Sequence, residues 1–299
     1  MDKRAVIRTV LQGGRPPYVP WEFGFTKEAR EKLEGHFGAG RLADALQCHM
    51  MGVGAHEQLM EDAGNDHVRD IFGVTWDRSV DKDIGTPVGL VLPEPSLRGF
   101  SMPLDAHRKV FNGMDKALAD RPDLFRLFAF GFSLYERAWT LRGMENLMLD
   151  FIEHPDFVHE LFEVITDHNV AIIKEAVTYD IDAVIFGDDW GQQHGLQMGP
   201  RLWREFIKPC LKRMYSTVRD AGKFVMIHSC GDVDELFDDL VEMGLNCFNP
   251  FQPDVMDAQL LRQERQRVAE RAEDRVRGGA EGRPRECLRV LTLSADRAR

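Results

Sequence analysis

Apolar runs and amphipathic stretches alternate in a regular order from residue 123 onward. Runs such as AVIF and FVMI are apolar at nearly every position, which is typical of strands buried on both faces of a parallel sheet. A stretch with the period of an amphipathic helix follows each run, and Gly or Pro marks many of the boundaries. The pattern predicts strands at 123–131, 182–189, 224–229 and 246–252, and helices at 133–142, 145–152, 155–178, 200–221 and 233–243.

The first part of the chain is less regular. Tyr18–Gly24 follows a Gly/Pro loop and predicts a short strand, after which Thr26 is expected to cap a helix over 27–33. Two strand-like pieces between residues 68 and 91 are separated by a charged turn and predict a hairpin at the edge of the main fold. Residues 36–58 are rich in Gly, His and Met, and their pattern favours no element.

The strict order of strand and helix predicts parallel βα units, hence an α/β fold. We expect a (β/α)₈ TIM barrel, because no GxGxxG follows the first strand and polar side chains recur where strands end. The carboxyl ends of the strands form the rim on which barrel active sites are built. An open, doubly wound sheet is the alternative. The rim residues are Glu22, Asp188, Asp189, His228, Cys230, Asn249 and Gln252.

Composition narrows the class of protein. The chain has 299 residues, of which 43% are hydrophobic, and this suffices for a large buried core. A formal net charge of −11 argues against a nucleic-acid or anionic membrane surface. No apolar run is long enough for a signal peptide or a membrane span, so we expect a cytoplasmic protein. Five scattered Cys residues without CxxC spacing argue against a disulfide framework.

The C-terminal segment differs from the rest. Residues 265–299 are rich in Arg, Ala, Glu and Gly, contain no aromatic residue and predict no convincing βα unit. We therefore divide the chain into a domain over 1–264 and an Arg-rich tail over 265–299, and we expect the barrel to be incomplete at its C-terminus. Our hypothesis is that the tail is non-native, as after a shift of reading frame. A genuine basic helical extension is the alternative.

The most informative motif is the run HSCGD at the end of the strand 224–229. Alternate residues of a strand share a face, so His228 and Cys230 are expected to point the same way. An imidazole and a thiolate are suitable ligands for zinc, although a zinc site needs at least a third ligand. A buried His satisfied by the backbone, beside a Cys that packs as a small hydrophobe, is the structural alternative.

Once these residues are placed in order, the chain resembles the uroporphyrinogen decarboxylase superfamily, and within it the methylcobamide methyltransferase-like branch. The most similar segment runs from FGDDWGQQHG (186–195) through 200–257, which contains HSCGDV and NPFQ. Weaker similarity extends over residues 1–264. The resemblance implies a (β/α)₈ barrel whose active site lies at the carboxyl mouth.

The resemblance also implies two different chemistries. Methyltransferases of this branch hold zinc on His-x-Cys and a later Cys, and transfer a methyl group between a corrinoid protein and a small thiol or methylated substrate. His228 and Cys230 match the first two ligands, whereas Cys287 lies at the wrong distance for the third. The resemblance therefore implies a zinc-dependent methyltransferase with a corrinoid partner protein and no nucleic-acid or membrane partner.

A metal-free decarboxylase acting on uroporphyrinogen or another carboxylic acid is the second interpretation. The decarboxylases carry an N-terminal Arg-rich motif, and here only Arg15 lies close to the corresponding position. A substrate with many carboxylates needs several Arg or Lys side chains. The absence of the Arg-rich motif from this sequence favours the methyltransferase. A third interpretation is an inactive, truncated chain or a binding scaffold.

The remaining rim residues are assigned as follows. Asp188 and Glu22 are the candidate catalytic carboxylates, with a helix cap and a buried ion pair as their respective structural alternatives. One of Asp188 and Asp189 is expected to face the mouth and the other a loop or a helix N-terminus. Asn249, Gln252, Asp189 and His194 are candidate substrate contacts, while Cys210 and Cys247 are expected to be structural.

Overall fold

The computed structural model describes residues 2–257 and 289–290. The helices are α1 Lys3–Leu11, α2 Lys27–Phe37, α3 Leu42–Ala45, α4 Leu104–His107, α5 Met114–Asp120, α6 Tyr135–Arg142, α7 Met144–Glu153, α8 Pro155–Ala176, α9 Gly199–Leu202, α10 Lys208–Asp220 and α11 Phe237–Met243. Short helical turns are η1 His56–Leu59, η2 Arg108–Phe111, η3 Trp203–Ile207 and η4 Asp234–Leu236. The strands are β1 Met50–Val53, β2 Glu61–Gly64, β3 His67–Arg69, β4 Thr75–Asp77, β5 Thr86–Val88, β6 Phe125–Phe130, β7 Ala183–Gly187, β8 Phe224–His228, β9 Cys247–Asn249 and β10 Arg289–Val290.

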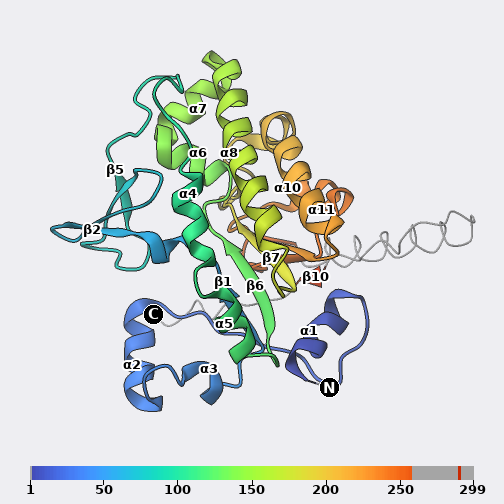
Figure 1. The fold of residues 1–299 in the computed structure, drawn as a ribbon. Coiled ribbons are helices and arrows are strands. Elements are labelled where there is room, and N and C mark those ends of the chain that lie inside the picture. The colour runs from blue at the N-terminus through green and yellow to red at the C-terminus, as the bar shows by residue number, and fades with distance from the viewer. Residues whose placement is uncertain (1, 258–288, 291–299) are drawn as a thin grey trace, which may run out of the picture.

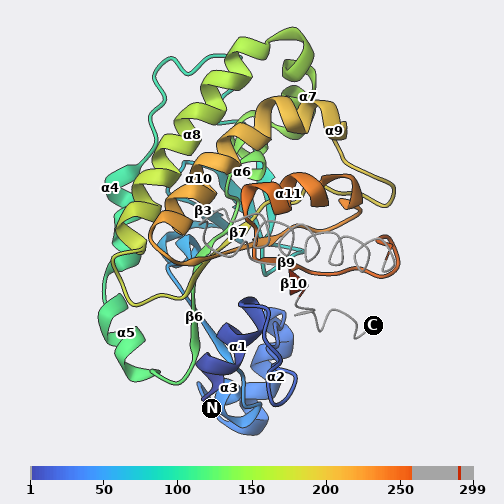
Figure 2. The ribbon, with the colours of Figure 1, turned by 90° about the vertical axis from the view of Figure 1, so that its right-hand side faces the viewer.

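The centre of the molecule is a parallel sheet of six strands in the order β1-β6-β7-β8-β9-β10. The long helices α8 and α10 lie side by side along this sheet, and α11 follows them (Figures 1 and 2). The strand–helix order predicted from residue 123 onward is confirmed, and so is the α/β fold class. Within the described residues, six strands of the barrel-type sheet are present.

The strands of this sheet have two different apolar faces. One set of alternate residues, including Phe128, Val184 and Ile227, packs into the large core shared with the helices. The other set, including Phe125, Met226 and Cys247, forms a smaller cluster with Ile7 and Leu11 of α1. Cys247 therefore belongs to the core, as predicted. Because side chains alternate along a strand, this pattern also decides which polar residues beyond the strands face inward.

Helix α1 covers the amino ends of the strands and is held there by charge. Arg4 and Arg8 both bind the buried carboxylate of Asp182, which directly precedes β7. The Asp182 carboxylate also accepts the backbone N–H of Arg126 in β6 at 2.9 Å. One buried anion thus joins α1, β6 and β7. The opposite, carboxyl ends of the strands remain available for a site.

The strand predicted over Tyr18–Gly24 is wrong. Pro20 lacks an N–H donor, and the apolar side chains of Val19, Trp21 and Phe23 are largely exposed, so the segment joins no sheet. The first strand is β1, within the part of the chain that the sequence left unassigned. Helix α2 begins after the Thr26 cap, as predicted.

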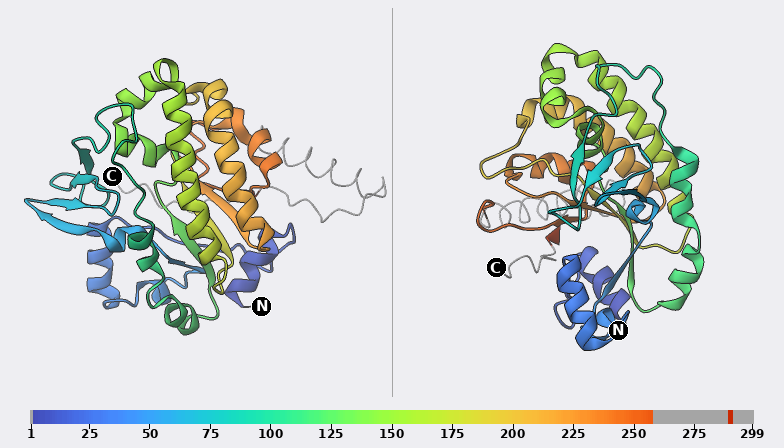
Figure 3. Two further views of the ribbon diagram at one scale, coloured as in Figure 1. Left: turned by 45° about the horizontal axis from the view of Figure 1, so that its top comes forward. Right: turned by 90° about the vertical axis from the view of Figure 1, so that its left-hand side faces the viewer.

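The hairpin predicted between residues 68 and 91 is confirmed as β4 and β5, which belong to a four-stranded antiparallel sheet with β2 and β3. Figure 3 shows this small sheet beside the main body. Cys287 and most of residues 265–299, to which the tail hypothesis applies, lie outside the described residues. The exception is β10, which pairs in parallel with β9. None of the helices in the described part combines the length and hydrophobicity of a membrane span.

Three buried histidines lie between the small sheet and the main helices. Nδ1 of His107 lies 2.7 Å from Nε2 of His168, and the two rings are stacked. His56 receives a hydrogen bond from the buried Arg137, whose guanidinium also binds Asp70 at 2.8 Å. Burial lowers the pKa of His107 to about 3 and that of His168 to about 4, and it also lowers the pKa of His56. These imidazoles are therefore neutral in the folded protein.

We expect this cluster to make folding sensitive to acid. Below pH 6.5 the unfolded chain binds a proton at each histidine that the folded chain does not, so stability falls with pH until the lowered pKa is reached. From pH 7 to pH 5 each histidine should cost about 2 kcal/mol of unfolding free energy. In His168→Gln, the fall in unfolding free energy from pH 7 to pH 5, measured by urea unfolding, should be smaller by that amount. His194→Gln, at an exposed histidine, is the control and should show the same fall as the unaltered protein. An unchanged fall in His168→Gln would contradict the assignment.

Candidate metal centre

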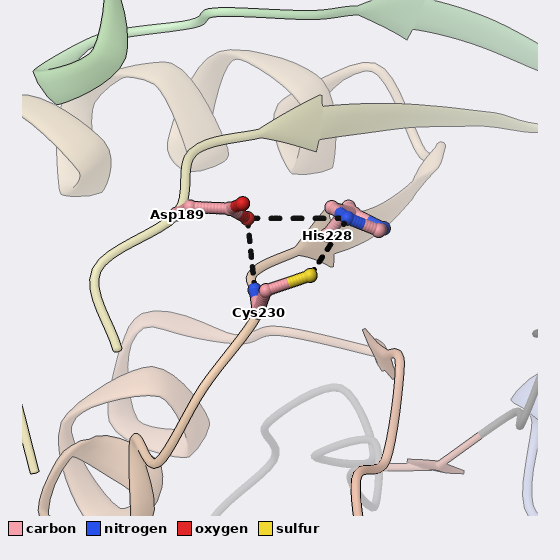
Figure 4. A group of neighbouring side chains, drawn as sticks. All are labelled: Asp189, His228 and Cys230. Atoms are coloured by element: carbon pink, nitrogen blue, oxygen red, sulfur yellow. Dashed lines mark hydrogen bonds and ion pairs between the residues drawn. The ribbon is translucent and has the colours of Figure 1, made fainter. Parts of the chain in front are cut away.

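Three metal-ligating side chains meet at the carboxyl ends of β7 and β8. Asp189 follows β7, His228 ends β8, and Cys230 lies two residues further on the same face, as predicted (Figure 4). Nε2 of His228 lies 3.5 Å from Sγ of Cys230 and 3.9 Å from Oδ1 of Asp189. The three ligand atoms lie within 4.8 Å of one another. The sequence predicted the first pair, and the fold adds Asp189.

The glycine turn after Cys230 allows this approach. Gly231 has a φ of 85°, and a Cβ atom there would lie 2.3 Å from the backbone carbon of Gly191. Glycine therefore meets both the backbone conformation and the close contact between the loops that follow β7 and β8. The backbone N–H of Cys230 donates to Oδ1 of Asp189 at 2.8 Å. This bond ties the two loops together at the site.

The donor set fits a divalent metal. Around a tetrahedral zinc ion, neighbouring nitrogen, oxygen and sulfur ligands are separated by roughly 3.4–3.6 Å. The distance of 3.5 Å between Nε2 of His228 and Sγ of Cys230 lies in this range, and the Asp189 oxygen needs only a small movement. Three protein ligands would leave one position for a substrate, which is the arrangement of catalytic rather than structural zinc.

Asn249 orients the histidine of this group. Its Oδ1 atom accepts a hydrogen bond from Nδ1–H of His228 at 2.7 Å, and the parallel register places the two residues opposite each other. With the proton on Nδ1, the lone pair of Nε2 faces Cys230 and Asp189, as a metal ligand requires. Asn249 is itself buried. Asn249 thus supports His228 and is also one of the residues that line the pocket, which is compatible with its predicted contact with a substrate.

Asp188 does not reach the site. Its buried carboxylate accepts backbone N–H groups of Leu134, Tyr135 and Glu136 at the start of α6, and Nε1–H of Trp190 at 2.7 Å. Burial raises the pKa of the Asp188 carboxyl, and these hydrogen bonds oppose the rise. The alternation along β7 explains the difference, because Phe186 and Asp188 face the helices. Asp189 is the carboxylate that faces the mouth.

Glu22 and His194 do not belong to the group formed by Asp189, His228 and Cys230. Oε2 of Glu22 accepts the backbone N–H of Met50 at 2.9 Å, which places it at the amino end of β1. Glu22 was expected to end a strand over residues 18–24, and because that strand is not present, the expectation is wrong. His194 is exposed in the loop after β7, and its neighbour Gln193 lines the pocket. The catalytic role of Glu22 and the substrate role of His194 gain no support from these positions.

A large open pocket lies in front of the ligands. It has a volume of about 1100 Å³ and is bordered by Asp189, His228 and Cys230. Gln252 lines it as well and accepts the backbone N–H of Gly231, so it contacts both the pocket and the glycine turn. Its predicted role in substrate binding is compatible with this position. The pocket is much larger than a metal ion needs.

Several residues near the site were not predicted. Phe25, Asp83 and Asp254 line the pocket from loops, where no periodic pattern identifies them. Phe251 also lines it, from the end of the strand predicted over 246–252, which the structure ends earlier, at Asn249. Glu136, in the first turn of α6, lies near Asp189; burial, followed by the charges of Asp188 and Asp189, raises its pKa. Its place in the first turn of the helix that follows β6 was the only available signal.

Comparisons with known proteins agree with the fold and with the family resemblance. The family model for uroporphyrinogen decarboxylase (URO-D) matches residues 127–272 and confirms the resemblance to that superfamily. The match runs past the boundary predicted at residue 264, which stays a prediction. A solved structure, a methyltransferase from Methanosarcina mazei, is similar with a TM-score of 0.64 and 15% sequence identity, covering 84% of this chain and 76% of that chain. No curated protein matches the sequence.

Replacing Asn249 should weaken metal binding without removing a ligand. In Asn249→Ala the His228 ring loses the acceptor that fixes its tautomer, so we expect affinity for zinc to fall about 10–100-fold. Competition with a chelating dye measures this change. Asn249→Asp retains an acceptor and should retain most of the affinity. Asn246→Ala is the control, because Asn246 is also a buried Asn and its Oδ1 accepts the backbone N–H of Val225 near the start of β8; equal losses in both alanine variants would contradict the role of Asn249.

Replacing Asp188 should lower the stability of the protein more than replacing Asp189. Asp188→Ala leaves four N–H donors without their acceptor and should lower the unfolding free energy of the metal-free protein by about 2–4 kcal/mol. Asp189→Ala removes a half-buried side chain at the mouth and should cost about 1 kcal/mol. Urea unfolding with a chelator present tests both, and the opposite order would refute the assignment.

Proposed function

We propose that this protein of the uroporphyrinogen decarboxylase superfamily is a zinc-dependent methyltransferase that acts with a corrinoid protein. The observation that carries the proposal is the convergence of Asp189, His228 and Cys230 at the mouth of the sheet. Zinc bound there would lower the pKa of a coordinated thiol or withdraw electrons from a leaving heteroatom. The similarity of fold to a methyltransferase is compatible with this chemistry.

The residues of the chain would divide the work as follows. Asp189, His228 and Cys230 would hold the metal, with Cys230 as its thiolate. Asn249 would keep the proton of His228 on Nδ1, and Gln252 would present its amide to a substrate in the pocket. The open pocket would admit both a small substrate and the methyl-bearing corrinoid of a partner protein.

A metal-free decarboxylase is the competing function, and the family match includes it by name. That reaction on uroporphyrinogen would require cationic side chains to receive several carboxylates. Among the described residues that line the pocket, none is Arg or Lys. The composition of the pocket therefore favours the methyltransferase.

Metal content tests the proposed function directly. The purified protein should bind about one zinc per chain, and Cys230→Ala should lose it because two ligands hold zinc poorly. Elemental analysis after dialysis measures this. Cys247→Ala is a matched control, since Cys247 is a buried thiol of the neighbouring strand that lies in the core. Absence of zinc from the unaltered protein would favour the metal-free alternative, whereas full retention of zinc in Cys230→Ala would show that the metal is held elsewhere and would overturn the proposed site.

A further inference from the structure

The loops that follow β7 and β8 run side by side and are joined by hydrogen bonds. The backbone N–H of Trp190 donates to Oγ of Ser229 at 3.1 Å, and the backbone N–H of Gly191 donates to the carbonyl oxygen of Cys230 at 3.1 Å. In the opposite direction, the backbone N–H of Cys230 donates to the Asp189 carboxylate (Figure 4). Two of the three candidate ligands therefore lie on this pair of loops, and their separation depends on how the loops are held.

The side chain of Asp232 joins the same two loops further along. Its Oδ2 atom accepts the backbone N–H of Gly195 at 3.0 Å, and its Oδ1 atom accepts the backbone N–H of Asp234 at 3.1 Å. The backbone N–H of Asp232 donates to the carbonyl oxygen of Gln192 at 2.8 Å, and that of Gln192 donates to the carbonyl oxygen of Gly195 at 2.9 Å. One carboxylate thus fastens the turn over 192–195 to the loop after β8.

Hydrogen bonds, and not apolar packing, hold this turn in place. Residues 192–194 are exposed and contribute no side chain to the two described cores. Gly195 has a φ of 77°, a conformation that favours glycine and provides no side chain for packing. A carboxylate that accepts a backbone N–H forms a stronger hydrogen bond than a neutral acceptor does. Loss of the Asp232 carboxylate should therefore loosen the turn.

We propose that Asp232 is a positioning residue of the candidate metal centre. Its carboxylate holds the loop after β7 against the loop after β8 and thereby keeps the Asp189 oxygen close to His228 and Cys230. Asp232 is not itself a member of the ligand group. The inference rests on the proposed function, because it assigns a further role at the same site. Groups that orient metal ligands contribute strongly to metal affinity, and Asp232 acts one step further out, through the loop.

The first experiment measures metal binding by the full chain. Asp232→Ala should lower the affinity for zinc about 3–10-fold, measured by competition with a chelating dye. With Co²⁺ in place of zinc, the visible absorption bands report the coordination geometry, and they should shift or weaken as Asp189 coordinates less well. A role of Asp232 in stability alone would leave this spectrum unchanged. Asp238→Ala is the matched control, because it removes the same charge from an exposed Asp of α11.

The second experiment measures the loop itself, in the presence of a chelator. Hydrogen exchange followed by mass spectrometry should show amides of 191–197 exchanging about 10-fold faster in Asp232→Ala, and those of β7 unchanged. Asp232→Asn keeps one acceptor oxygen, so its effects on exchange and on zinc affinity should be smaller than those of Asp232→Ala. Equal effects of the two variants, or equal effects of Asp238→Ala, would contradict the assignment.

The two experiments separate this inference from the proposed function. If the unaltered protein binds no zinc, the proposed function is lost, while faster exchange in Asp232→Ala would still support the connection between the loops. If the unaltered protein binds zinc and Asp232→Ala changes neither the affinity nor the Co²⁺ spectrum, the inference alone is overturned.

Discussion

The parallel register of β7, β8 and β9 is the constraint on which the site depends. It pairs Gly187 with His228 and His228 with Asn249, so the carboxyl ends of three strands meet at one edge. Hydrogen bonds of a parallel ladder leave little freedom to shift this register, because a slip of one residue would exchange the two apolar faces. The anion of Asp182 anchors α1 to the opposite ends of β6 and β7.

The two faces of the strands have separate tasks. Residues that face the helices form the large core, and Asp188 continues this face by satisfying the first N–H groups of α6. Residues of the inner face form the small core under α1 and end in polar groups: Asp189, His228 and Asn249. Core packing and the candidate site thus use alternate residues of the same strands.

The inner rim lacks, among the described residues, the cationic groups that a polycarboxylate substrate would need. A thiol, an imidazole and a carboxylate converge, and the described pocket lining contributes carboxylates and phenyl rings in place of guanidinium groups. This combination is suited to a bound metal. Family resemblance alone would leave both chemistries open, since they share one scaffold.

By itself the sequence determined the parallel strand–helix order after residue 123, the α2 cap and the shared face of His228 and Cys230, because these follow from periods of 2 and 3.6 residues and from local capping. Only the tertiary structure decided the rest. It replaced the expected strand at 18–24 by β1, whose partner β6 lies far along the chain. It also placed Asp189, and not Asp188, beside His228 and Cys230 in the candidate metal group, and it paired Asn249 with His228. These outcomes depend on the pairing of strands that are far apart in the sequence and on loops that have no periodic pattern. The local sequence pattern carries no information on either.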